Sequence, residues 1–175
     1  MSSALDVVKA VAFLFIAVLI EVSVIGAYTP LGGTADLVLV VLISIALLRG
    51  SVFGAFAGFG AGLLIDTANL TTLGFTSLLL TLAGFWTGRY GETTARDRFH
   101  APFLAVAVIT VLYAFGTLAL NAVLGEPAPA DAYLSGLPAT VLLNLVLTWP
   151  VYSLMRKVFP PVDVFDRVHD VRLLG

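Results

Sequence analysis

The stretch GSVFGAFAGFGAGLLIDTANLTTLG, which runs from Gly50 to Gly74, sets the fold expected for this chain. On a helix its four-residue glycine spacing forms one shallow stripe, where the backbone of a second helix can approach closely. In water so many glycines would weaken a helix, each by about 0.5–1 kcal/mol relative to alanine. The pattern therefore predicts a helix packed inside a membrane, where the backbone must hydrogen-bond internally. The stripe consists of Gly50, Gly54, Gly58 and Gly62.

The composition of the chain places it in the membrane class. Of its 175 residues, 59% are hydrophobic and only 11% are charged, compared with about 25% charged residues in a soluble domain. The chain has no cysteine, which excludes disulfides and thiolate metal sites. Its net charge of −2 argues against binding to nucleic acid.

Apolar segments divide the chain into an all-α bundle of six predicted transmembrane helices. We expect one transmembrane domain over residues 1–158, followed by an amphipathic cytoplasmic tail over residues 159–175. The second, third and fourth segments are shorter than the roughly 20 residues of a full span, so we expect them to borrow flanking residues or to lie in a thinned or protein-lined region. The segments are Val7–Tyr28, Leu31 or Ala35 to Leu48, Val52–Ile65, Phe75–Gly88, Pro102–Leu124 and Leu137–Met155.

The basic residues predict the orientation of the bundle. All nine can be placed on one side of the membrane, and the other three connections contain no Lys or Arg. By the positive-inside rule, both termini and the two basic loops are expected in the cytoplasm, and the number of spans is even. The residues are Lys9, Arg49, Arg89, Arg96, Arg98, Arg156, Lys157, Arg167 and Arg172.

Three acidic residues, Glu21, Asp36 and Asp66, are candidates for a site that binds a partner or lines a cavity. At about 1.5 Å per helical residue they lie about 18 to 25 Å above the nearest basic residue, within the roughly 30 Å of hydrocarbon. They are therefore expected in the outer leaflet, where the chain supplies no basic partner. A carboxylate there needs water, a proton or a cation from elsewhere.

Each of these acids also has a simpler structural interpretation. Asp36 is well placed to cap the second helix, and Glu21 can extend toward the outer interface. Asp66 lies one further step along the glycine stripe, near the end of its helix, where the helix dipole disfavours a carboxylate. The nearby residues that could satisfy Asp66 are Asn69, Thr71 and Thr72.

A second stripe of small residues follows the fourth segment and could meet the first one across the turn at Asp66–Gly74. It consists of Ser77, Thr81, Gly84 and Gly88. Asn121 and Asn144 are candidates for hydrogen bonds between helices. The glycines predicted to pack helices together are Gly50, Gly54, Gly58, Gly62, Gly74, Gly84 and Gly88.

No pattern of catalytic residues is visible. His100 and His169, the two histidines, lie in segments expected on the cytoplasmic side and lack the spacing of metal ligands. The glycine stripe is not followed by the lysine of a phosphate-binding loop. The chain is therefore expected to be a non-enzyme without a metal or another cofactor.

One ordered set of residues stands out in the central part of the chain, namely Asp36-Leu37, Leu48, Gly50, Gly54, Gly58, Gly62-Leu63-Leu64, Asp66 and Leu73-Gly74. With this set, and with its size and six-segment layout, the sequence resembles the MreD family of rod shape-determining membrane proteins over most of its length. One departure is Ala35, where a proline would be expected before the aspartate.

The resemblance implies a scaffold of the cell-elongation machinery in the bacterial inner membrane. Such a protein associates with MreC, a single-span protein, and through it with MreB, RodA and a class B penicillin-binding transpeptidase that makes peptidoglycan. Its fold is similar to the substrate-binding subunits of energy-coupling-factor vitamin transporters. The alternative hypothesis is therefore a membrane-embedded substrate-binding subunit for a small cationic or vitamin-like molecule.

Overall fold

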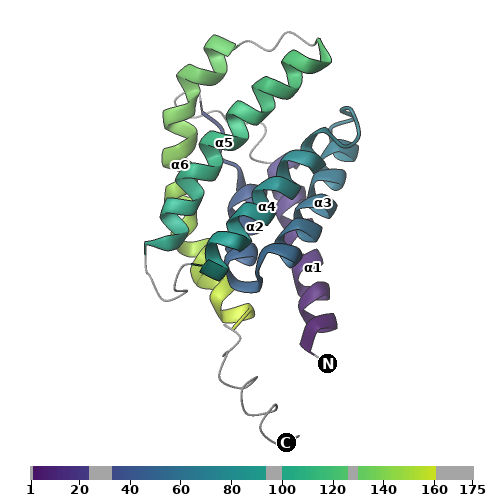
Figure 1. Ribbon diagram of the computed structural model, residues 1–175, viewed down its shortest axis with the longest axis vertical. Coiled ribbons are helices and arrows are strands. Elements are labelled where there is room, and N and C mark those ends of the chain that lie inside the picture. The colour runs from purple at the N-terminus through teal and green to yellow at the C-terminus, as the bar shows by residue number, and fades with distance from the viewer. Residues whose placement is uncertain (1, 24–32, 94–99, 126–129, 161–175) are drawn as a thin grey trace, which may run out of the picture.

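The fold is all-helical. A computed structural model describes residues 2–23, 33–93, 100–125 and 130–160, and within these ranges the protein contains six α-helices and no strand. Figure 1 shows the helices gathered in one bundle, with α5 and α6 as a long pair along one flank. The helices are α1 (Ser2–Ser23), α2 (Leu37–Arg49), α3 (Ser51–Ala68), α4 (Phe75–Thr93), α5 (Ala101–Leu124) and α6 (Ala130–Val158).

Helix α2 forms the centre of the bundle. Every residue from Val38 to Leu48 is buried, and α2 contacts all five other helices. A helix that is apolar all round is stable only where neighbours cover every face. With 13 residues, α2 is about 20 Å long, and its burial in protein explains how a segment shorter than a membrane span is accommodated.

Helices α3 and α4 make the most extensive contact in the bundle, along the glycine stripe. A Cβ atom on Gly54 would lie 2.5 Å from the carbonyl oxygen of Gly84, and one on Gly58 would overlap the backbone of Leu80. The two backbones therefore touch, and no larger residue fits between them. The remaining close pairs are Gly62 with Ser77, and Gly88 with Gly50 and Ser51.

Gly74 does not have the packing role that was predicted for it. No atom lies within 4 Å of the position that its Cβ would occupy, and its φ angle is +96°. It serves the turn into α4, because only glycine adopts this backbone conformation without strain. Gly50 has the same φ angle at the junction between α2 and α3, so it combines a turn with a close approach to α4.

One end of the bundle carries the basic residues that the structure describes. Arg49, after α2, forms an ion pair with Asp6 of α1 at 3.0 Å and lies over the ring of Phe159, 5.3 Å from its centroid. The Lys9 ammonium donates to the carbonyl of Val158 at 3.4 Å. These contacts place the start of α1, the α2–α3 junction and the end of α6 at the same end.

Several predicted boundaries shift in the structure. Helix α6 begins at Ala130 rather than Leu137, so part of the predicted outer loop is helical. Among the described residues three helices are long and apolar enough to cross a membrane, namely Ser51–Ala68, Ala101–Leu124 and Tyr133–Val158. The predicted end of the first segment at Tyr28, and the tail from residue 161 onward, lie outside the described residues.

Candidate functional site

Asp66 is fully buried and caps the start of α4, although it belongs to α3. Its carboxylate accepts hydrogen bonds from the backbone N–H groups of Gly74 at 2.8 Å, Thr76 at 3.0 Å and Ser77 at 3.4 Å. The first N–H groups of a helix have no partner within it and carry the positive end of its dipole. The dipole of α3 disfavours Asp66, but that of α4 stabilises it.

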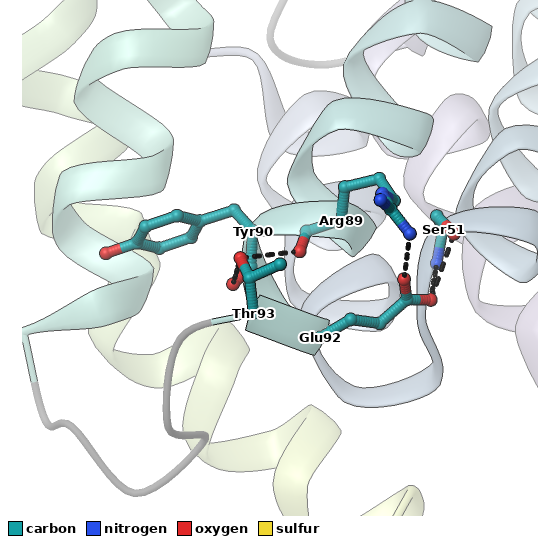
Figure 2. A network of polar contacts seen from close by, with 5 residues as sticks. All are labelled: Ser51, Arg89, Tyr90, Glu92 and Thr93. Atoms are coloured by element: carbon teal, nitrogen blue, oxygen red, sulfur yellow. Dashed lines mark hydrogen bonds and ion pairs between the residues drawn. The ribbon is translucent and has the colours of Figure 1, made fainter.

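Glu92 performs the same task at the opposite end of the pair, and the sequence analysis did not select it. Its Oε1 atom accepts from the backbone N–H of Ser51 at 2.7 Å and from the Ser51 hydroxyl at 2.9 Å, as Figure 2 shows. Arg89 lies 3.6 Å from its other oxygen. Each helix of the pair thus receives its N-terminal cap from the last turns of the other. The signal was present, because Glu92 follows Gly88 by four residues just as Asp66 follows Gly62.

Asp36 and Glu21 together cap the start of α2. Asp36 Oδ1 accepts from the backbone N–H of Leu39, and Glu21 Oε2 accepts from that of Val38, both at 2.8 Å. The N-cap interpretation of Asp36 is confirmed. Glu21 crosses from α1 to reach the same helix start, and the two carboxyl groups lie within hydrogen-bonding reach of each other.

Asn144 of α6 fixes the chain segment that carries Asp36. Its side-chain oxygen accepts from the backbone N–H of Asp36 at 2.8 Å, and its side-chain nitrogen donates to the hydroxyl of Thr110 at 3.1 Å. The side chain is fully buried. Asn144 therefore forms the predicted hydrogen bond between helices and ties α5 and α6 to the start of α2.

A cavity of about 510 Å³ lies at this end of the bundle, which we call the acidic cavity. All six helices, or the residues just before them, contribute to its wall. Glu21 and Asp36 line it, whereas Asp66 does not, although its neighbours Ile65 and Thr76 do. The wall also carries two tyrosines and six threonines, and apart from Thr71 none of them was selected from the sequence, because they come from segments far apart in the chain. These residues are Tyr113, Tyr133, Thr34, Thr71, Thr76, Thr110, Thr117 and Thr140.

A second, apolar hollow of about 810 Å³ lies between α1 and α3. Phe53, Phe56 and Leu64 are among its walls, and Arg49 lies at the end nearest the basic residues. Gly60 also lines it and faces open space, so this glycine is not part of the contact with α4. An apolar surface of this kind suits lipid chains or another apolar helix.

The described residues contain no group of three or more His, Cys, Asp or Glu side chains that could hold a metal ion. His100 precedes α5, and the acids capping α2, α3 and α4 are bonded to backbone N–H groups. The clearest chemistry of these acids is therefore structural, and the acidic cavity offers a polar place for a ligand.

The apolar helices, the buried central helix and the close glycine contacts define an all-helical membrane protein. The sequence model of the family described as rod shape-determining protein MreD matches residues 1–159, nearly the whole chain. The chain therefore belongs to the MreD family, as the resemblance indicated. Comparisons with curated proteins and with solved structures gave no match.

Proposed function

We propose that this protein is a non-enzymatic scaffold of the bacterial cell-elongation machinery in the inner membrane. Membership of the MreD family implies a role in determining rod shape. The observation that carries the scaffold role is the α3–α4 pair, in which backbone touches backbone and each helix caps the other. Such a pair resists bending, because any separation breaks buried hydrogen bonds and opens voids.

We propose six membrane spans with both termini in the cytoplasm. The placement of Lys9, Arg49, Arg89 and the end of α6 at one end of the bundle supports this orientation. The short helix α2 counts as a span, since it runs from the acidic cavity to Arg49. A bundle of six helices with a cavity at the outer end also supports a fold similar to the substrate-binding subunits of energy-coupling-factor transporters.

The proposed partner is an MreC-like single-span protein, which links the scaffold to MreB, RodA and a class B penicillin-binding transpeptidase. Glu21 and Asp36, at the outer end, are the proposed contacts for cationic or hydrogen-bond donating groups of this partner. Asp66 is buried in its cap, so we propose that it acts by fixing the start of α4. The family match and the absence of Lys and Arg from the outer connections support this assignment.

Copurification tests the scaffold. Gly58→Leu places a side chain against the Leu80 backbone, and we expect it to reduce recovery of the tagged MreC-like partner at least fivefold. Val146→Leu, at a position on α6 that is 67% exposed, is the control and should leave recovery unchanged. Equal recovery with both variants, at equal amounts of protein in the membrane, would count against the scaffold.

A second candidate function is the substrate-binding subunit of a small-molecule transporter. The acidic cavity favours it, because transporter ligands bind in polar cavities formed between helices. Removal of a transporter subunit would make the host cell dependent on a nutrient, whereas removal of a scaffold would change the shape of the cell.

A further inference from the structure

We propose that the acidic cavity binds an organic cation, namely a protonated primary amine attached to an apolar or aromatic body. The inference does not depend on whether the chain acts as a scaffold or as a transporter subunit. The cation has two possible sources, a free amine or a basic side chain of a partner protein, and both present the same ammonium group.

The acidic cavity carries net negative charge. Glu21 and Asp36 lie side by side in its wall, and the described residues that line the cavity include no Lys, Arg or His. Two carboxyl groups within hydrogen-bonding reach of each other share a proton and carry about one negative charge together, whereas the start of α2, which both of them cap, supplies about half a positive charge. The three connections at this end contain no Lys or Arg, so a cation from outside the chain complements the site.

Two polar groups in the wall of the cavity are available to a ligand. The Tyr113 hydroxyl and the Asn121 side-chain amide line the cavity, and neither has a hydrogen-bond partner among the residues that the structure describes. The Tyr113 side chain packs against the hydrophobic core and lines the cavity together with Glu21 and Asp36. Polar groups that line a cavity and have no partner mark a place that a ligand can complete.

The rest of the wall combines hydroxyl groups with apolar side chains. Aliphatic and aromatic side chains line the cavity between the hydroxyl groups, and Leu39, Ile65, Phe75 and Leu137 are among them. A metal ion would not contact these apolar side chains, whereas the apolar body of an amine would pack against them. Aromatic rings such as Tyr113 and Tyr133 also attract organic cations.

The test measures binding of tyramine to the full-length protein in nanodiscs by isothermal titration calorimetry at constant ionic strength. The uncharged probe 4-ethylphenol has the same skeleton without the amine. We expect tyramine to bind at least tenfold more tightly than 4-ethylphenol. Glu21→Gln with Asp36→Asn should reduce tyramine affinity at least tenfold, while both amides keep an oxygen to cap α2.

The control variant is Asp131→Asn, which removes an exposed acid at the start of α6 that does not line the cavity. Its tyramine affinity should equal that of the unmodified protein. No tyramine binding to folded protein, or equal affinity in the double variant and the unmodified protein, would overturn the proposal. Tyr113→Phe gives a second readout, because loss of its hydroxyl should weaken tyramine binding without removing a hydrogen bond between residues that the structure describes.

The two sources are separated by adding tyramine to the copurified assembly. Release of the partner at tyramine concentrations that fill the site identifies a basic side chain of the partner as the natural occupant. Retention of the partner with tyramine bound identifies a free amine. Either result supports the cation site, and a partner that stays bound while tyramine fails to bind contradicts it.

Discussion

Asp66 and Glu92 occupy equivalent positions at the two ends of one helix pair. Each follows a packing glycine by four residues, and each carboxylate accepts hydrogen bonds from the first N–H groups of the neighbouring helix. In hydrocarbon such N–H groups cannot bond to water, and leaving each one without a hydrogen bond would cost roughly several kcal/mol. A carboxylate that accepts these hydrogen bonds removes that cost. Asp66 and Glu92 are therefore explained by the helix starts that they face.

Removal of the buried cap should destabilise the protein measurably. We expect Asp66→Ala to lower the free energy of unfolding by about 2 kcal/mol or more, because it leaves buried N–H groups at the start of α4 unpaired. Glu92→Ala should cost less, about 1 kcal/mol, since its side chain is 33% exposed and water can replace it. Unfolding in mixed micelles, followed by circular dichroism during addition of dodecyl sulfate, measures both values. Equal stability of Asp66→Ala and the unmodified protein would contradict the capping role.

At this scale the sequence pointed to Glu21, Asp36 and Asp66 but not to Glu92, and it did not reveal the hydrogen bonds of Glu21 and Asp66. Asp36 was interpreted as the cap of its own helix because an N-cap is a local feature of sequence. Glu21 and Asp66 cap helices other than their own. Contacts between segments that are far apart in the sequence can be identified only once the fold is known. Tyr113 was missed for the same reason, because it reaches the acidic cavity from α5.

Among the elements, α3 decides how closely the bundle packs. Its glycines at positions 54, 58 and 62 face α4, while Gly60 faces the apolar hollow beside α1. The sequence analysis predicted the stripe, since a four-residue period marks one face of a helix. It did not predict the longer α6 or the turn role of Gly74, because both depend on contacts and backbone angles outside any periodic pattern.

Two alanine variants of α3 separate packing from helix propensity. We expect Gly58→Ala to destabilise the protein by about 1–3 kcal/mol, because the new methyl group meets the backbone of Leu80. Gly60→Ala adds the same methyl group in open space and should be neutral or stabilising by up to about 1 kcal/mol. Thermal unfolding of both variants in one detergent compares their stabilities. Equal effects of both variants would show that α3 and α4 do not touch along this face.

For the whole molecule, the distribution of charge gives an orientation that experiment can check. Basic residues gather at one end of the bundle, and the acidic cavity lies at the other. The sequence predicted this arrangement from its loops alone, since the positive-inside rule acts on short connections and not on packing. The cavity itself was not predictable in shape, because six helices build its wall.

The absence of cysteine from the chain makes the orientation straightforward to test. Leu73→Cys, at a position that is 70% exposed in the turn between α3 and α4, should react with a membrane-impermeant maleimide in intact spheroplasts. Arg89→Cys, near the opposite end, should react only after the membrane is opened, because the basic end faces the cytoplasm. Labelling in the reverse order would invert the proposed topology.

Depletion of this protein in its native host, with cell shape scored by microscopy, tests the scaffold role most directly. We expect rods to become round as the protein is lost, and we expect the unmodified chain to restore rod shape while Gly58→Leu does not. Cells that remain rod-shaped after complete depletion, and that instead require a nutrient for growth, would contradict it.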